Sequence, residues 1–174
     1  KKMKIKYNPI VLVDWLADTI YSLFIVQSSD FLLLGFGTSK VKIIKKAKKK
    51  NIKTIYFLNT LSPLYRKKII EEEYDKLGLS ELNTTEPEAI TRRMNESIKM
   101  ADYVGAISSF QKQTYIDEGV DESKMFLSFL GVDTSVFFPK KIKKKDKFIV
   151  IYVGNHFVRK GVKYLTEAFN SLKL

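Results

Sequence analysis

The sequence has 174 residues, of which 45% are hydrophobic and 29% are charged, and it contains no Cys and one His, His156. This composition is typical of a globular protein, and the length is too short for two complete α/β domains. Disulfides, thiolate nucleophiles, Cys-based zinc sites and multi-histidine metal centres are excluded, so no metal cofactor is expected.

Lys and Arg outnumber Asp and Glu by 31 to 19, a formal charge of +12 that predicts an anionic partner. The excess lies mostly in residues 1–53, which hold 12 basic and three acidic side chains. A phosphorylated ligand, an anionic membrane or a nucleic acid would fit, and so would a lysine-biased composition without a ligand. Nucleic acid is not expected, because the lysines have no interleaved aromatic residues and belong to no recognisable nucleic-acid motif.

The N-terminal stretch briefly imitates a signal peptide, with lysines ahead of an apolar run at residues 10–13. Asp14 and Asp18 interrupt that run and no small-residue cleavage site follows, so export is not expected. Residues 10–26 are also too polar and too short to span a bilayer. We expect a cytoplasmic protein, with peripheral contact at the inner leaflet as a further expectation.

Apolar spacing predicts the first elements of the chain. Residues 10–13 fit a short buried strand and residues 15–27 fit a helix. Continuous apolar or β-prone runs at residues 31–34 and 54–58 predict two strands, the first of them buried on both faces. Because a helix separates these two strands, they form a crossover unit, which implies a parallel sheet.

That connecting helix is rich in lysine and has Thr38 or Ser39 as its expected cap. Its apolar side consists of Val41, Ile44 and Ala47. The lysines between Lys40 and Lys53 are therefore free to approach anionic lipid, while the apolar side is needed for the core. Gly35 and Gly37 before the helix lack the third glycine of a dinucleotide fingerprint, so a turn without a ligand is the preferred interpretation.

The middle of the chain is less regular, and residues 59–86 show no clear pattern. A helix is predicted to begin near Pro87, and a third strand follows at residues 103–107. The inner face of the helix is predicted to consist of Ile90, Met94, Ser97 and Ile98.

Another helix is predicted at residues 110–118, capped by Ser108 or Ser109 and ended by Gly119. Residues 125–130 predict the next strand.

The C-terminal part predicts an exposed linker at residues 140–147, six of which are Lys. A β-prone run at residues 148–153 and a helix at residues 161–172 follow. One such unit cannot bury its own apolar surface. We therefore expect residues 148–174 to open a second α/β domain whose remainder is missing, after a partial first domain over residues 1–139.

The loop of this last unit carries the most informative pattern. A glycine turn is followed by two adjacent cations, and a helix begins at the next glycine. Amides at a helix N-terminus bind anions, and cations add charge-assisted contacts to phosphate oxygens. The pattern predicts a diphosphate site, against the equally weighted alternative of a surface loop with incidental charges. Its residues are Gly154, Asn155, Arg159, Lys160 and Gly161.

Three segments in order carry a family resemblance. Residues 96–108 are similar to the motif E…ADxVxAxS, residues 124–139 to KxxVxxNGVD…FxP, and residues 148–161 to IxFVGRxxxxKG. These motifs belong to the GT-B glycosyltransferases, in particular the large retaining group called family 4, which this chain resembles over residues 96–174. Residues 30–62 resemble that family only weakly, as a strand, helix and strand.

The resemblance implies a GT-B type of α/β fold, with Rossmann-like parallel sheets and helices on both faces of each sheet. It also implies an acceptor-side N-terminal domain and a donor-binding C-terminal domain, the latter truncated here. The family moves a sugar from a nucleotide-diphosphate donor to an acceptor, here expected to be lipid-linked or a polysaccharide. Lys160 would then neutralise the donor diphosphate and assist departure of the nucleotide.

This sequence also departs from the family pattern. Asn155 stands where the family has an arginine, so one phosphate contact is missing unless Arg159 replaces it. Leu130 stands where the hinge motif has Asn, and Asn59 falls about where many members keep a histidine. The family's Glu-x7-Glu motif would lie beyond Leu174, and catalytic residues are not assigned. The alternative hypothesis is an inactive remnant that acts as a binding or partner module.

Overall fold

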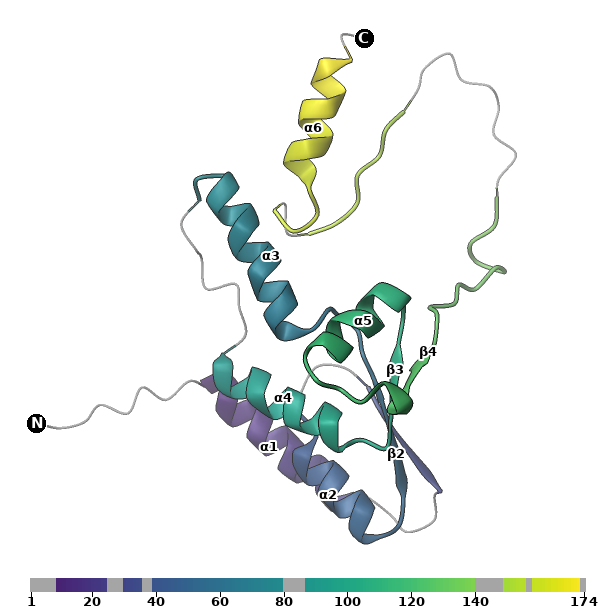
Figure 1. Cartoon of the computed structure of the whole chain (residues 1–174). Helices are drawn as coiled ribbons and strands as arrows, with labels where there is room; N and C mark the ends of the chain where they lie inside the picture. The colour runs from purple at the N-terminus through teal and green to yellow at the C-terminus, as the bar shows by residue number, and fades with distance from the viewer. Residues whose placement is uncertain are drawn as a thin grey trace, which may run out of the picture. The chain divides into compact units, whose positions relative to one another are not determined.

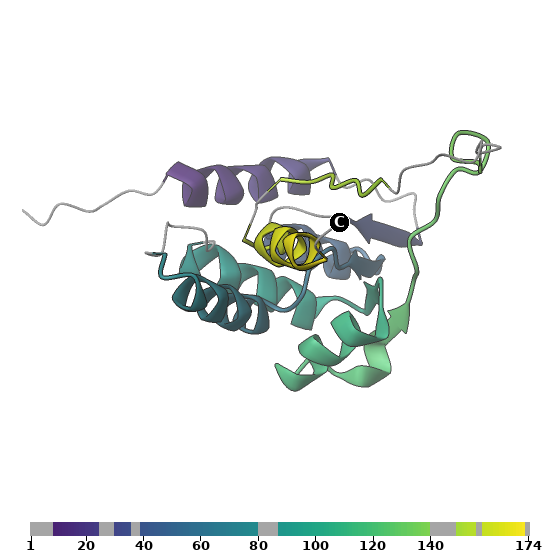
Figure 2. The ribbon, with the colours of Figure 1, turned by 90° about the horizontal axis from the view of Figure 1, so that it is seen from above.

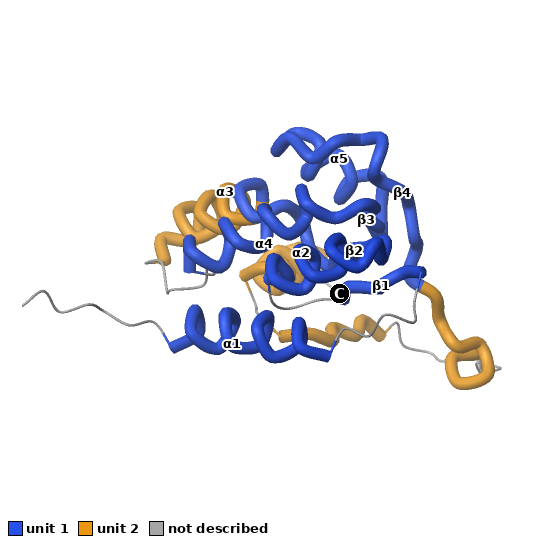
Figure 3. Tube along the Cα trace, turned by 90° about the horizontal axis from the view of Figure 1, so that it is seen from below, with its two compact units in different colours: residues 1–65, 83–130 blue, residues 66–82, 131–174 orange. Residues whose placement is uncertain are grey.

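The chain divides into two compact units (Figure 3). The first consists of residues 1–65 and 83–130, and the second of residues 66–82 and 131–174. The predicted linker at residues 140–147 lies outside the described residues, and the predicted domain boundaries stay a prediction. The computed structural model describes residues 9–24, 30–35, 39–79, 87–139, 149–155 and 158–172.

A parallel four-stranded sheet with the order β1-β2-β3-β4 forms the centre of the first unit (Figure 1). The register places Leu33 opposite Ile55, and Ile55 opposite Tyr103. The α/β class predicted from the sequence is confirmed. The strands are β1 (Phe31–Leu34), β2 (Lys53–Phe57), β3 (Tyr103–Ala106) and β4 (Met125–Leu127).

Among the described residues, four helices belong to the first unit, and a short 3-10 helix, η1 (Glu122–Lys124), precedes β4. α1 packs against α2 and α4 (Figures 1 and 2). α3 (Pro63–Lys76) begins in the first unit and continues in the second, which also contains α6 (Val162–Ser171). The helices of the first unit are α1 (Pro9–Leu23), α2 (Val41–Lys49), α4 (Glu88–Met100) and α5 (Ser109–Asp117).

The core of the first unit lies between one face of the sheet and the helices α2, α4 and α5. The predicted apolar sides of α2 and α4 are buried in it, which confirms both predictions. Side chains from the strands alternate into this core, as expected for a pleated sheet. The buried cluster contains Leu34, Ile43, Ile44, Tyr56, Leu58, Ile98, Ala101, Val104, Ala106, Tyr115, Val120 and Met125.

The other face of the sheet is not covered by described residues. Phe31, Leu33 and Tyr103 are exposed there, and the rings of Phe57 and Phe126 meet edge to face with centroids 6.0 Å apart. Crossovers between parallel strands share one hand, so an order that never reverses places successive helices on the same face. The predicted parallel sheet flanked by helices is confirmed, and in the described part of the chain α2, α4 and α5 lie on one face of it, because helices on both faces require a reversal of strand order.

α1 stands where a strand was predicted at residues 10–13, and that prediction is wrong. Pro9 occupies the first helical position, where its missing N–H costs no hydrogen bond. Asp14 and Asp18 then fall on one side of the helix and are buried. A four-residue apolar run fits a buried strand and a helix equally well, so periodicity alone could not separate them.

α3 occupies part of residues 59–86, where no pattern was recognised. Only Pro63 of this helix is buried, so no apolar stripe marks it in the sequence. Lys67 Nζ lies 3.3 Å from Glu71 Oε1, and a second pair with the same four-residue spacing follows one position later. Such pairs support an exposed helix only weakly.

The second unit contains the segment where a strand was predicted at residues 148–153. Residues 149–154 form no strand, and Ile151 and Val153 are exposed. A strand requires hydrogen bonds to a neighbour, and no described residue provides them here. α6 is present as predicted, and Tyr164 Oη donates a hydrogen bond to Glu73 Oε2 of α3 at 2.6 Å.

Two neighbouring leucines of β1 test the one-sided core. Leu34 is 4% exposed and Leu33 is 65% exposed. Leu34→Ala should lower the free energy of unfolding by about 2–5 kcal/mol, because it leaves a cavity in the core. Leu33→Ala should lower it by less than about 1 kcal/mol. Urea unfolding of both variants measures the difference, and equal losses would show that the second face is also packed.

Candidate anion-binding site

The five residues predicted to bind a diphosphate lie in the second unit, in and beside the loop that leads into α6. All five are described, whereas His156 between them is outside the described residues. Gly161 is the N-cap residue of α6 and has a φ of 67°, a left-handed conformation that favours glycine. Its amide donates to the carbonyl of Val158 at 3.0 Å, and the first bond of the helix runs from Leu165 N to Gly161 O at 3.1 Å.

The N-terminus of α6 has no side-chain cap. The amides between Gly161 and Leu165 precede the first intrahelical hydrogen bond and so have no acceptor within the helix. Arg159 and Lys160, immediately before them, are exposed and form no ion pair with another described residue. Uncapped amides and two cations therefore adjoin one another in the chain, and the predicted diphosphate site stays a prediction.

The loop brings Gly154 next to Lys160. A side-chain carbon at Gly154 would lie 3.7 Å from Lys160 Cγ and 3.2 Å from Tyr152 Oη. That hydroxyl is buried and has no hydrogen-bond partner among the described residues. Buried polar groups are normally hydrogen-bonded, so the unpaired hydroxyl of Tyr152 is a donor that an anionic acceptor could satisfy. Sequence reasoning gave Tyr152 no binding role, because it was assigned to the end of a β-prone run ahead of the glycine turn.

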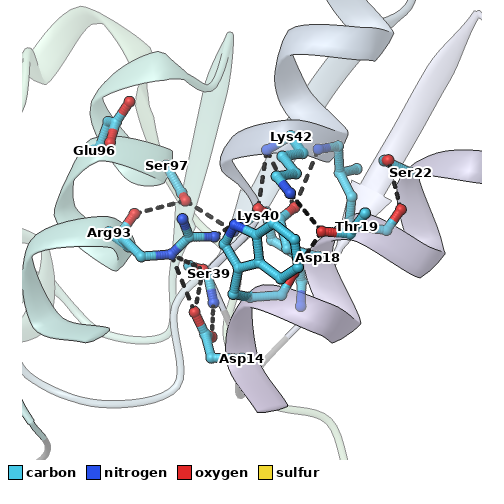
Figure 4. Close-up of polar contacts among 12 residues, drawn as sticks. Asp14, Asp18, Thr19, Ser22, Ser39, Lys40, Lys42, Arg93, Glu96 and Ser97 are labelled. Atoms are coloured by element: carbon cyan, nitrogen blue, oxygen red, sulfur yellow. Dashed lines mark hydrogen bonds and ion pairs between the residues drawn. The ribbon is translucent and has the colours of Figure 1, made fainter. Parts of the chain in front are cut away.

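The N-terminus of α2 in the first unit is occupied by carboxylates of α1 (Figure 4). Asp18 accepts from the amides of Lys42 and Ile43 at 3.0 and 3.1 Å. Asp14 accepts from the amide of Ser39 at 2.7 Å and also from its hydroxyl. Ser39 therefore does not cap α2 as predicted, since its hydroxyl donates to a carboxylate instead. Thr38, the other predicted cap, lies outside the described residues.

Arg93 of α4 completes this buried cluster. Its Nε lies 3.2 Å from Asp14 Oδ2, and its Nη2 lies 2.9 Å from Asp18 Oδ2. Ser97 accepts from the Lys40 amide at 2.8 Å, so a side chain of α4 also contacts the start of α2 (Figure 4). Burial lowers the pKa of Lys40, while the two carboxylates oppose that shift. The two negative charges are thus balanced by the Arg93 guanidinium, by the Lys40 ammonium and by the amides of α2.

Two more helices of the sheet region have filled N-termini. Glu118 Oε1 accepts from the amides of Leu64 and Tyr65 at 3.1 and 3.3 Å, at the start of α3. Ser108 caps α5 by accepting from the Gln111 amide at 3.1 Å, as the sequence predicted. The protein's own side chains therefore occupy the N-termini of α2, α3 and α5.

The motif at residues 96–108 has structural contacts. Asp102 accepts from the amide and hydroxyl of Thr54 at 2.9 and 2.8 Å, which joins the starts of β3 and β2. Gln111 accepts from Ile107 N and donates to Thr60 O, both at 2.8 Å. Glu96 is exposed and lies 3.5 Å from Lys45 Nζ, a surface ion pair.

No protein-family model and no curated protein matches the chain. Among the described residues, no group of three His, Asp or Glu side chains is arranged to hold a metal ion. None of the helices in the described ranges is long and apolar enough to cross a membrane. The resemblance to glycosyltransferases therefore rests on the ordered motifs.

The buried cluster gives a test with a matched control. Asp18→Ala leaves the Arg93 guanidinium and two α2 amides without their acceptor, and should lower the free energy of unfolding by about 3–5 kcal/mol. Glu96→Ala removes only an exposed ion pair and should cost less than about 1 kcal/mol. Urea unfolding of both variants measures these changes. Similar small losses would show that Asp18 is hydrated instead of buried.

A second test concerns pH. Burial alone would raise the pKa of Asp102, but hydrogen bonds from Thr54 and the nearby Lys53 ammonium outweigh it and lower that pKa below 3.8. The ionised carboxylate therefore stabilises the fold above pH 3.8, and this contribution disappears as pH falls through the folded pKa. Asp102→Asn should cost about 1–2 kcal/mol near neutral pH. The difference from wild type should shrink in acid, and a gap that stays constant with pH would contradict this assignment.

Proposed function

We propose that the chain is part of a GT-B glycosyltransferase that transfers a sugar from a nucleotide-diphosphate donor to a lipid-linked or polysaccharide acceptor. The donor diphosphate binds at the loop before α6. Gly154, Asn155, Arg159, Lys160 and Gly161 form this site, in keeping with the motif that they resemble.

The observation that carries the proposal is a set of hydrogen-bond donors and positive charges, in and beside this loop, that have no described partner. The Tyr152 hydroxyl lacks a described partner, Lys160 lacks a described counter-ion, and the first amides of α6 lack a cap. All are donors or positive charges, and no described carboxylate neutralises them. A diphosphate provides several acceptor oxygens and negative charge in one group, which this combination of donors can bind.

The starts of α2 and α3 support the same assignment by contrast, whereas α4, like α6, has no side-chain cap. Glycine-containing turns before helices are the usual phosphate sites of parallel α/β sheets. At α2 that position is occupied by Asp14 and Asp18, and Glu118 occupies the corresponding position at α3. Carboxylates at these positions repel phosphate, so the loop before α6 is the better candidate for the donor.

The chemistry of the site follows from charge. When the bond between sugar and nucleotide breaks, negative charge grows on the departing diphosphate. Lys160 and the α6 amides stabilise that charge, and Arg159 adds a second cation. Asn155, which replaces a family arginine, contributes polarity without charge. The site therefore depends on Lys160 more than the family pattern requires.

Titration of the chain with UDP, GDP and ADP by calorimetry tests the proposal. Lys160→Gln should weaken binding of the preferred nucleotide by about 1.5–3 kcal/mol, which is roughly tenfold or more. Tyr152→Phe should weaken it by about 0.5–1.5 kcal/mol. The control is Lys163→Gln, because the Lys163 ammonium already lies 3.7 Å from Glu167 Oε1 and should contribute less than a factor of about two.

Two results would contradict the proposal. The first is an affinity of Lys160→Gln equal to that of wild type, which would place the diphosphate elsewhere. The second is the absence of binding to all three nucleotides, which would restrict the family resemblance to the fold.

A further inference from the structure

Helix α1 has its polar side inside and its apolar side outside. Its buried residues are Asp14, Asp18 and Ser22, whereas a surface helix normally buries an apolar stripe. The exposed apolar side chains other than Trp15, whose ring is covered by Lys42, are named here the outer face of α1. They are Ile10, Val13, Leu16, Ile20, Tyr21 and Leu23, with Phe24 directly after the helix.

The outer face of α1 contains no charged residue. Asp14 and Asp18 are the only charged side chains of the helix, and both are bound by α2 and by Arg93. The polar side of α1 is therefore satisfied within the protein. Val13 is 61% and Leu23 68% exposed, so the remaining side of the helix presents several exposed apolar side chains, and exposed apolar patches mark interaction sites.

Lysines of α2 border this patch. Lys42 Nζ lies 3.6 Å from the ring centroid of Trp15 and donates to the hydroxyl of Thr19. Lys46 Nζ donates to the carbonyl of Leu23 at 3.4 Å. The two lysine stems thus lie along α1 and carry their ammonium groups to its border, with no carboxylate of α1 facing outward.

We propose that α1 lies flat in the interface of an anionic lipid bilayer. The outer face of α1 then contacts the acyl chains, and Lys42 and Lys46 contact headgroup phosphates. An apolar face with a border of cations is the pattern of interfacial helices, and anionic lipid is complementary to both parts. A protein partner would need acidic groups around its own apolar patch, and a second copy would bring its lysines against these lysines.

This proposal differs from the contact expected for the lysine helix alone. The apolar contact comes from α1, while α2 supplies only the charged border. It is independent of the glycosyltransferase proposal, because it involves neither the donor loop nor α6. A failure of nucleotide binding and a failure of membrane binding are therefore separate results.

The experiment uses the whole chain with vesicles of phosphatidylcholine, alone or with about 30% phosphatidylglycerol. Trp15 is the single tryptophan of the sequence, so its fluorescence reports on α1 directly. We expect flotation with the anionic vesicles, a blue shift of the emission, and quenching by lipids brominated on the acyl chains. About 0.5 M salt should weaken the binding by screening the lysines.

Substitutions then separate the two parts of the surface. Leu16→Gln combined with Ile20→Gln should lower partition into anionic vesicles at least tenfold, with an unchanged circular dichroism spectrum. Lys42→Gln combined with Lys46→Gln should lower binding to anionic vesicles more than to neutral ones. Leu64→Gln is the matched control, because Leu64 is an exposed apolar residue on α3 and its loss should change partition less than about twofold.

Three outcomes would overturn the proposal. The first is that the chain binds neither the neutral nor the anionic vesicles, and the second is that it binds both equally. The third is that the Leu16→Gln, Ile20→Gln variant binds as well as wild type. Sedimentation of the chain identifies the competing occupant. If the chain dimerises without binding vesicles, and the same double variant abolishes the dimer, the outer face of α1 is an interface between copies.

Discussion

Two buried carboxylates hold the helical layer of the first unit together. Asp14 and Asp18 of α1 bind the amides at the start of α2 and the guanidinium of Arg93 in α4. One group of charges thereby joins three helices that are distant in sequence. The cost of burying the carboxylates is offset only while all of these partners are present. The arrangement also sets the rotation of α1, and so explains why its apolar residues face outward.

The strand order has an equally broad effect on the first unit. Because β1 to β4 are arranged in sequence order, the helices that follow them collect on one side and the core has one layer of helices. Phe31, Leu33 and Phe126 on the opposite side are apolar yet uncovered by described residues. The exposed face of the sheet thus follows from the strand order. The exposed outer face of α1 follows from the buried carboxylates that set the rotation of that helix.

Part of this could be read from the sequence. Local sequence patterns were sufficient to predict several elements. These are the strands at residues 31–34 and 103–107, the inner face of α4 and the cap at Ser108. The start of α6 at Gly161 also follows from its local pattern. Sequence reasoning failed where a partner distant in the chain decides the outcome. Asp14 appeared to interrupt an apolar run because its acceptor role requires Ser39 and Arg93, and the burial of the Tyr152 hydroxyl depends on how its loop folds.

The sequence separation within the carboxylate cluster has a consequence for the order of folding. Asp14 and Asp18 meet Arg93 across 79 and 75 residues. A helix whose inward side is charged gains little from early hydrophobic collapse, and its carboxylates stay hydrated until α2 and α4 lie side by side. α1 therefore joins last, as a single step in which both carboxylates lose water together. The same property makes it the element that detaches first from an otherwise intact core.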